Sequence, residues 1–196
     1  MSAMPKQHKL TVDEYFAIEE KAERKSEFFN GEMFLVAGAS RQHNALTRNL
    51  TAALHLRLMS SNCRVFVADQ RVKIDRTGLY TYPDLLIVCG TPEYASENPN
   101  TLTNPKVVIE VLSNSTERYD RTTKFRQYKK LNSVQEYVLV SQDEPLIERF
   151  TRQSDGTWAQ TDFVGMDVDM TFATVKASVP LSDVYFEVEF PNPPPR

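Results

Sequence analysis

The chain has 196 residues, of which 41% are hydrophobic and 25% are charged, and its formal net charge is -3. A chain of this length and composition is expected to form one globular core that buries roughly 70% of the unfolded surface, and no apolar run approaches the ~18 residues of a membrane span. The negative net charge argues against a protein that binds nucleic acid by coating it with positive charge.

We therefore expect a single domain over residues 1–190, followed by a disordered proline-rich tail at 191–196. Residues 1–10 lack the apolar core and the cleavage site of a secretory signal, which predicts a cytoplasmic location. Cys63 and Cys89 lie in strand-like apolar segments without a CxxC partner. Two reduced, buried thiols are therefore favoured over a disulfide or a zinc site.

The first predicted elements are a helix, a β-hairpin and a second helix. Thr11 followed by Glu14 fits a capping box, which predicts that a short helix begins there. Two strand-like segments, 26–29 and 32–36, flank Asn30-Gly31, a pair that tolerates the positive φ angles of a type I′ turn. Apolar side chains then recur at helical spacing and predict an amphipathic helix through Leu46, Leu50, Ala53, Leu54 and Leu58.

Strands dominate the middle of the chain. A β-rich run at 65–74 precedes a turn at 77–78. The continuous apolar segment 85–88 is typical of a strand that is buried on both faces. The segment 107–112 is also predicted to be a strand and is apolar except at Glu110. Between these two segments, the proline- and asparagine-rich stretch 92–105 is predicted to be a loop.

The last part of the chain begins with a helix around 122–131 and a strand at 136–140, which complete a strand, helix, strand unit. A hairpin is predicted from strands at 146–150 and 158–164, and 182–186 is predicted to be a helix or a loop. The order of elements predicts an α/β fold with a mixed sheet, flanking helices and an N-terminal hairpin.

Glu110 is the anomaly of its apolar strand, because an unpaired carboxylate is rarely buried. Strand alternation places it on one face with Val108 and Leu112, toward the following helix or a cleft. The alternative is that this face meets water. Lys124 falls on the helix arc that contains Tyr128, so it is placed to reach inward as a counter-charge. The alternative for Lys124 is a boundary lysine that extends into water.

Asp84 lies immediately before a buried strand. If Asp84 and Glu110 meet at a sheet edge, the two carboxylates repel each other unless a cation lies between them. Mg²⁺ (or Mn²⁺) suits this pair better than zinc, because histidine and cysteine clusters are missing. The alternative for Asp84 is an Asx turn or cap after Pro83.

The segment 117–130 is locally basic, with six basic and two acidic residues and hence a balance of 6 − 2 = +4. Arg118 and Arg121 belong to this segment and are candidates for contacts with the backbone of nucleic acid. The alternative is an ordinary solvated helix face.

Many of these residues recur in one known family, and the chain resembles the Uma family of bacterial endonuclease-like proteins over nearly its whole length. The resemblance rests on Tyr82-Pro83-Asp84-Leu85, on Val108 to Thr116, on Asp120 with Lys124 and Tyr128, on Glu136 to Val140, and on Thr11 to Tyr15, Glu27 to Gly31 and His43.

The resemblance implies a restriction-endonuclease-like fold of the PD-(D/E)xK superfamily, in which an Asp and a Glu hold a divalent metal and a Lys lies near the attacking water. By position these residues are Asp84, Glu110 and Lys124. The usual lysine position, two residues after the acid, is Leu112 in this chain, and the family pattern moves the lysine to the following helix. The implied catalytic set is therefore split between strands and a helix.

Two further residues are weaker candidates. Glu27 resembles the additional N-terminal acid of the superfamily's metal site, although a surface glutamate on the hairpin is the alternative. For His43 a cap or packing role is favoured over catalysis.

The resemblance implies a metal-dependent endonuclease that uses Mg²⁺ or Mn²⁺ to hydrolyse phosphodiester bonds of nucleic acid, with DNA as the expected substrate. A homodimer is expected because superfamily relatives often cut both strands as dimers, and no membrane partner is expected. The alternative is a non-catalytic nucleic-acid-binding or assembly module on the same fold.

Overall fold

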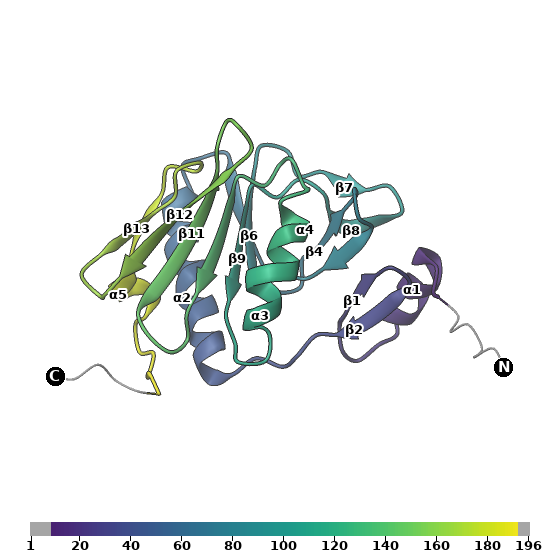
Figure 1. The fold of residues 1–196 in the computed structure, drawn as a ribbon, viewed down its shortest axis with the longest axis horizontal. Coiled ribbons are helices and arrows are strands. Elements are labelled where there is room, and N and C mark those ends of the chain that lie inside the picture. Colours follow the sequence, from purple (N-terminus) through teal and green to yellow (C-terminus); the bar gives the residue numbers. More distant parts are fainter. Residues whose placement is uncertain (1–8, 192–196) are drawn as a thin grey trace.

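A computed structural model describes residues 9–191, so the predicted tail lies outside the described residues from position 192 onward. The centre of the fold is a six-stranded mixed sheet in the order β12-β11-β10-β9-β6-β3 (Figure 1). Its strands are β3 (Cys63–Val67), β6 (Leu85–Cys89), β9 (Val107–Val111), β10 (Glu136–Val140), β11 (Leu146–Arg152) and β12 (Trp158–Val164).

A second sheet has the strand order β2-β1-β5-β4-β8-β7, and a short third sheet pairs β13 with β14. Their strands are β1 (Ser26–Phe29), β2 (Glu32–Leu35), β4 (Arg71–Ile74), β5 (Leu79–Thr81), β7 (Tyr94–Ala95), β8 (Asn98–Leu102), β13 (Asp169–Thr171) and β14 (Ser178–Pro180). The predicted mixed α/β architecture with an N-terminal hairpin is thus confirmed. At the hairpin turn Asn30 and Gly31 have φ angles of 54° and 82°, as the Asn-Gly pair predicted.

The helices are α1 (Val12–Glu19), α2 (Arg41–Leu58), α3 (Glu117–Tyr119), the π-helical segment η1 (Asp120–Lys124), α4 (Phe125–Tyr128) and α5 (Leu181–Val184). Tyr15 and Phe16 of α1 pack against Phe28 and Tyr80 of the second sheet. We call the continuous helical segment 117–128 the site helix. It connects β9 to β10, which are parallel, and in Figure 1 it lies in front of the sheet while α2 lies behind. In residues 9–191 no helix is both long and apolar enough to cross a membrane.

The core has two main layers, one on each side of β9. Leu50 and Leu54 of α2 are fully buried and belong to the same hydrophobic cluster as Ile109. Val108 belongs to the opposite cluster, together with Tyr128 of the site helix. The predicted alternation along β9 is therefore confirmed, and even positions such as Glu110 face the site helix.

Two stretches differ from the predicted elements. The run at 65–74 is divided between two sheets, because the chain turns at Ala68, where φ is 22°. The stretch 92–105, predicted to be a loop, contains β7 and β8. Pro99 is tolerated in β8 because the parallel ladder with β4 involves only Thr101 and Leu102.

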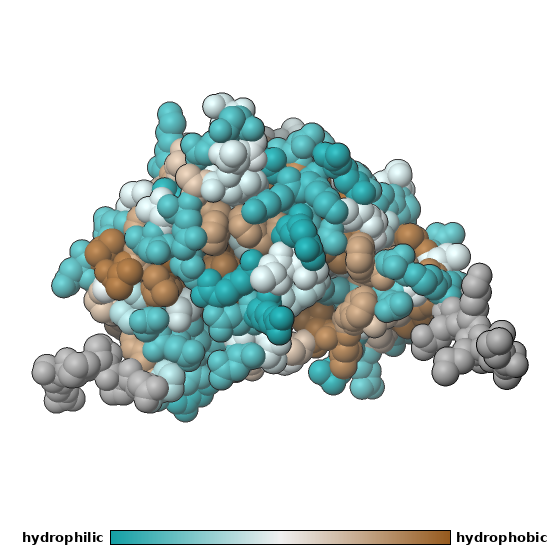
Figure 2. Space-filling model, in the orientation of Figure 1, coloured by the Kyte–Doolittle hydropathy of each residue, from teal (hydrophilic) through white to brown (hydrophobic). Residues whose placement is uncertain are grey.

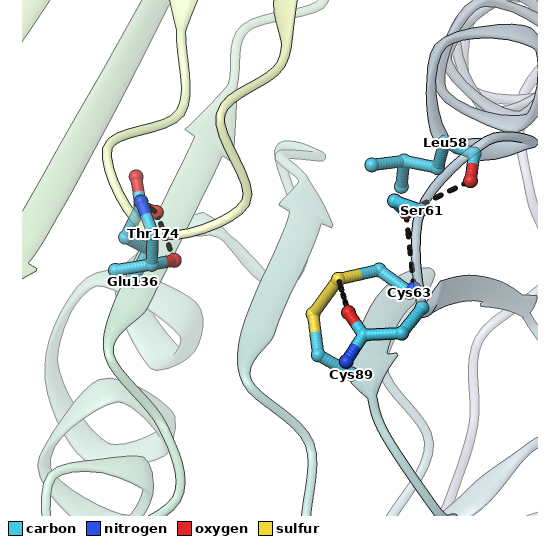
Figure 3. Close-up of a disulfide and its surroundings, with 7 residues drawn as sticks. Leu58, Ser61, Cys63, Cys89, Glu136 and Thr174 are labelled. Carbon is cyan, nitrogen blue, oxygen red and sulfur yellow. Dashed lines mark hydrogen bonds between the residues drawn. A yellow bond between two sulfur atoms is a disulfide. The ribbon is translucent and has the colours of Figure 1, made fainter.

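The cysteines are paired, so the prediction of two reduced thiols was wrong. β3 is antiparallel to β6, and their register places Cys63 directly opposite Cys89, where the two sulfur atoms form a disulfide (Figure 3). The residues are separated by 26 positions in the sequence, and the strand pairing alone brings them together. Ser61 accepts a hydrogen bond from the Cys63 N–H at 3.0 Å and donates one to the Leu58 carbonyl at 2.8 Å, which fixes the turn between α2 and β3.

Candidate active site

Asp84 and Glu110 lie side by side at one end of β6 and β9. The two strands are antiparallel and pair Leu85 with Ile109, so the preceding residue on β6 lies opposite the following residue on β9. The Asp84 N–H donates to Glu110 Oε2 at 3.4 Å, and Asp84 Oδ2 accepts from the Val111 N–H at 2.8 Å. Strand pairing thus brings together two carboxylates that are distant in the sequence.

Lys124 reaches these carboxylates from the site helix. In the wider turn of η1 the Phe125 N–H donates to the Asp120 carbonyl, and the side chains at both ends of η1 face inward: Asp120 is 4% exposed and Lys124 is 5% exposed. Lys124 Nζ lies 2.9 Å from Glu110 Oε1 and 3.8 Å from Asp120 Oδ1. The predicted inward orientation of Lys124 is confirmed, and π-helical turns of this kind are common at functional sites.

Glu27 joins the site from the N-terminal hairpin. Its Oε1 lies 3.6 Å from Lys124 Nζ and accepts a hydrogen bond from the Thr81 hydroxyl, while its Oε2 accepts one from the Tyr119 hydroxyl at 2.9 Å. The Glu27 side chain is only 12% exposed. Glu27 is therefore not a surface glutamate of the hairpin, and the structure places it with the other predicted residues.

Two residues of the cluster were not expected there. His43 Nε2 lies 3.0 Å from Asp84 Oδ1, a side-chain contact that no sequence spacing indicates, because α2 and β6 are brought together only by tertiary packing. The cap interaction at His43 also exists, since the Ser40 hydroxyl accepts from the His43 N–H at 3.0 Å. Asp120 was not assigned to the site either, although its i, i+4 spacing from Lys124 was an available signal.

The charges of the cluster do not balance. Burial raises the pKa of Glu110 well above its ordinary value, and Asp120 and Asp84 raise it further against the opposing effect of Lys124. Burial alone would lower the pKa of Lys124, but Glu110, Glu27 and Asp120 outweigh this effect and hold the pKa well above its ordinary value. Lys124 is therefore an ammonium group at neutral pH, and it faces an excess of carboxylates.

This excess of negative charge fits a hard divalent cation. Glu110 Oε1 is buried and, among the described residues, receives no hydrogen bond of good geometry; the ammonium of Lys124 is its close cationic neighbour. Within residues 9–191 no group of three or more His, Cys, Asp or Glu side chains is arranged so that it could hold a metal ion. Mg²⁺ commonly uses one or two carboxylates and keeps several waters, so the pair Asp84 and Glu110 is a sufficient donor set.

The two arginines predicted to contact nucleic acid have different environments. Arg121 is bound to Glu117 at 2.7 Å and also to Glu148, so its guanidinium is already paired. Arg118 is exposed, and within the part of the chain that the structure describes it has no acidic partner. The outward surface over α3 and α4 is largely hydrophilic (Figure 2). Of the two arginines, Arg118 is the one available to a ligand.

Comparisons with known proteins identify the family of the chain. The Uma2 family, described as "Putative restriction endonuclease", matches residues 12–179. The uncharacterized protein sll1609 of Synechocystis sp. is 35% identical over 167 residues, which cover 85% of this chain and 94% of the relative. A second Synechocystis protein, slr1290, is 33% identical over 159 residues, which cover 81% of this chain and 83% of that protein.

A solved structure has a similar fold. It is described as a "putative nuclease belonging to DUF820" from Anabaena variabilis, and it matches with a TM-score of 0.73 over 90% of this chain and 97% of that chain, at 17% sequence identity. This likeness shows a shared nuclease-like fold. It agrees with the predicted mixed sheet and flanking helices. The family model covers most of the sequence, and the chain therefore belongs to the Uma2 family of restriction-endonuclease-like proteins.

Proposed function

We propose that the protein is a metal-dependent nuclease that hydrolyses phosphodiester bonds of nucleic acid, with DNA as the expected substrate. The observation that carries this proposal is the convergence of Asp84, Glu110 and Lys124 from two strands and a helix. A buried ion pair contributes little net stability compared with well-packed apolar side chains. The stability of the fold therefore does not by itself explain why these charged side chains are buried together. Membership of the Uma2 family supports the same activity.

Asp84 and Glu110 would hold the metal ion, with Glu27 as an additional acid. A bound Mg²⁺ or Mn²⁺ would polarise the scissile phosphate and lower the pKa of a coordinated water. Burial and acidic neighbours raise the pKa of Glu110 and so disfavour its charged form. A bound cation would favour the carboxylate and offset this effect.

Lys124 would stabilise the negative charge that develops on the phosphate and orient the attacking water. Because its pKa is held well above the ordinary value, it acts as a fixed positive charge and not as a proton acceptor. A preorganised charge in a water-poor site stabilises a transition state without reorganisation at the moment of reaction. Glu27 and Asp120 keep the ammonium in place, at 3.6 and 3.8 Å.

Arg118 would contact the nucleic-acid backbone beside this site. It lies on the first turn of the site helix and is exposed. A contact of this kind contributes affinity and a salt dependence but reads no sequence. With a formal net charge of -3 on the chain, we expect modest binding that weakens as salt is added.

A cleavage assay tests the proposal. Purified protein is incubated with Mg²⁺ or Mn²⁺ and labelled double-stranded DNA, single-stranded DNA or RNA, beside the Asp84→Asn and Glu110→Gln variants. Asp167→Asn, an exposed acid remote in sequence from the cluster, is the matched control. We expect metal-dependent cutting that falls by about 100-fold or more in both site variants and is unchanged in the control. Absence of cutting by the unmodified chain, or equal cutting by all four proteins, contradicts the proposal and favours a binding module.

A further inference from the structure

His43 occupies an unusual position for a packing histidine. It lies in the first turn of α2, and its side chain is 16% exposed. Its Nε2 atom lies 3.0 Å from Asp84 Oδ1, while its Nδ1 atom lies 3.4 Å from the Thr47 hydroxyl, one helical turn further on. Both ring nitrogens therefore have partners, and one partner is a candidate metal ligand.

The two contacts select one tautomer of the ring. Asp84 Oδ1 is a carboxylate oxygen that can only accept, so the 3.0 Å contact favours the neutral imidazole with its proton on Nε2. Nδ1 then carries no proton and can accept from the Thr47 hydroxyl at 3.4 Å. Thr47, His43 and Asp84 therefore form a directed series of polar contacts from α2 to the end of β6.

Asp84 is held from two sides as a result. The Val111 N–H on β9 donates to Oδ2 at 2.8 Å, and Nε2 of His43 on α2 contacts Oδ1 at 3.0 Å. One polar partner on each oxygen restricts the rotation of the carboxylate, and each oxygen keeps a second lone pair for another ligand. Without His43, only the strand contact would orient Asp84.

We propose that His43 is a positioning residue that fixes Asp84 in the orientation required to bind a divalent cation, an inference that rests on the proposed function of the Asp84 and Glu110 pair. His43 acts through Asp84 and does not bind the metal itself. Groups that orient metal ligands in this way typically change metal affinity by 10- to 100-fold when they are removed.

Mn²⁺ titration without nucleic acid tests the consequence. We compare the unmodified chain with His43→Ala, with His43→Gln, whose amide N–H can occupy the place of Nε2–H, and with His55→Ala as a control at an exposed position on the same helix. We expect His43→Ala to bind Mn²⁺ about 10- to 100-fold more weakly, His43→Gln to recover most of the loss, and His55→Ala to bind normally. Thermal unfolding in EDTA shows whether each variant is folded.

Two results of the titration overturn the inference. Unchanged Mn²⁺ affinity in a folded His43→Ala variant assigns the histidine to packing. Equal loss in His43→Ala and His43→Gln, with both folded, makes the imidazole a direct ligand.

Long-range ¹H–¹⁵N spectra of the imidazole at alkaline pH, recorded without metal, test the contact itself. We expect the Nε2–H tautomer at His43, and an Nδ1–H tautomer overturns the inference even if the unmodified chain binds no Mn²⁺. Failure of the unmodified chain to bind Mn²⁺ would instead contradict the proposed function, so the two failures are distinguishable.

Discussion

Replacing Lys124 with Met should strongly destabilise the protein, whereas Glu110→Gln should not. Lys124 Nζ faces Glu110, Glu27 and Asp120 at 2.9, 3.6 and 3.8 Å. Its removal leaves Glu110, which is 2% exposed, without a cationic partner, and breaking a buried ion pair from one side costs about 3–5 kcal/mol. Glu110→Gln removes a buried charge but leaves Lys124 with two carboxylates, so we expect a change of less than about 1 kcal/mol.

Urea unfolding at neutral pH in EDTA measures the difference. Trp158 is the single tryptophan, and its ring lies 5.3 Å from that of Phe125 in the site helix, so its fluorescence reports on this region. With a slope of about 2 kcal/mol per molar urea, Lys124→Met should lower the midpoint by about 1.5–2.5 M. Lys130→Met, at an exposed position of the same chain segment, is the control.

A double variant isolates the interaction. If the cost of Lys124→Met comes from an uncompensated Glu110, adding Glu110→Gln should restore part of the lost stability, with a coupling of up to about 3 kcal/mol. Equal midpoints for Lys124→Met and Lys130→Met, or no recovery in the double variant, would refute the reasoning.

Three further predictions concern the arginines of the site helix, Glu97 in the second sheet and the disulfide of the central sheet. Arg118→Ala should weaken DNA binding and reduce the slope of log affinity against log salt by about one, as measured by anisotropy titrations at several salt concentrations; an unchanged slope rejects the contact. Arg121→Ala breaks existing ion pairs and should instead lower the melting temperature, as measured by thermal unfolding. Burial alone would raise the pKa of Glu97, but hydrogen bonds from Lys73 and Tyr80 lower it from 4.5 to about 2. The stabilising charge of Glu97 is therefore present above about pH 4.5 and is lost as the pH falls toward 2. The deficit of Glu97→Gln, about 1 kcal/mol at neutral pH, should therefore vanish over that window in unfolding curves, and a deficit that is constant with pH contradicts this assignment. Reduction of the disulfide between Cys63 and Cys89 should lower the free energy of unfolding by up to about 3 kcal/mol, and a count of two free thiols in the unreduced protein would show that the pair is not formed.

Signals that act over a few residues predicted much of the fold. Thr11 and Glu14 form the expected capping box at the start of α1, and the Asn30-Gly31 pair forms the hairpin turn. Glu110 and Lys124 were placed inward because the periods of strand and helix fix which face a side chain occupies. The structure has both side chains buried and in contact.

Features that depend on pairing between distant segments could not be predicted. The register between β3 and β6 sets Cys63 opposite Cys89, and no local pattern encodes that register. The contact of His43 with Asp84 likewise requires α2 to pack beside the end of β6. β8 was missed because its sequence, with Pro99 and two asparagines, has low strand propensity, which the neighbouring strands override.

Anomalous scattering from crystals grown with Mn²⁺ tests the central claim most directly, because it locates the metal independently of any substrate. We predict one strong peak that contacts the carboxylates of both Asp84 and Glu110, and loss of this peak in Glu110→Gln crystals. A strong peak elsewhere with none between these two carboxylates, or an unchanged peak in the variant, would contradict the account.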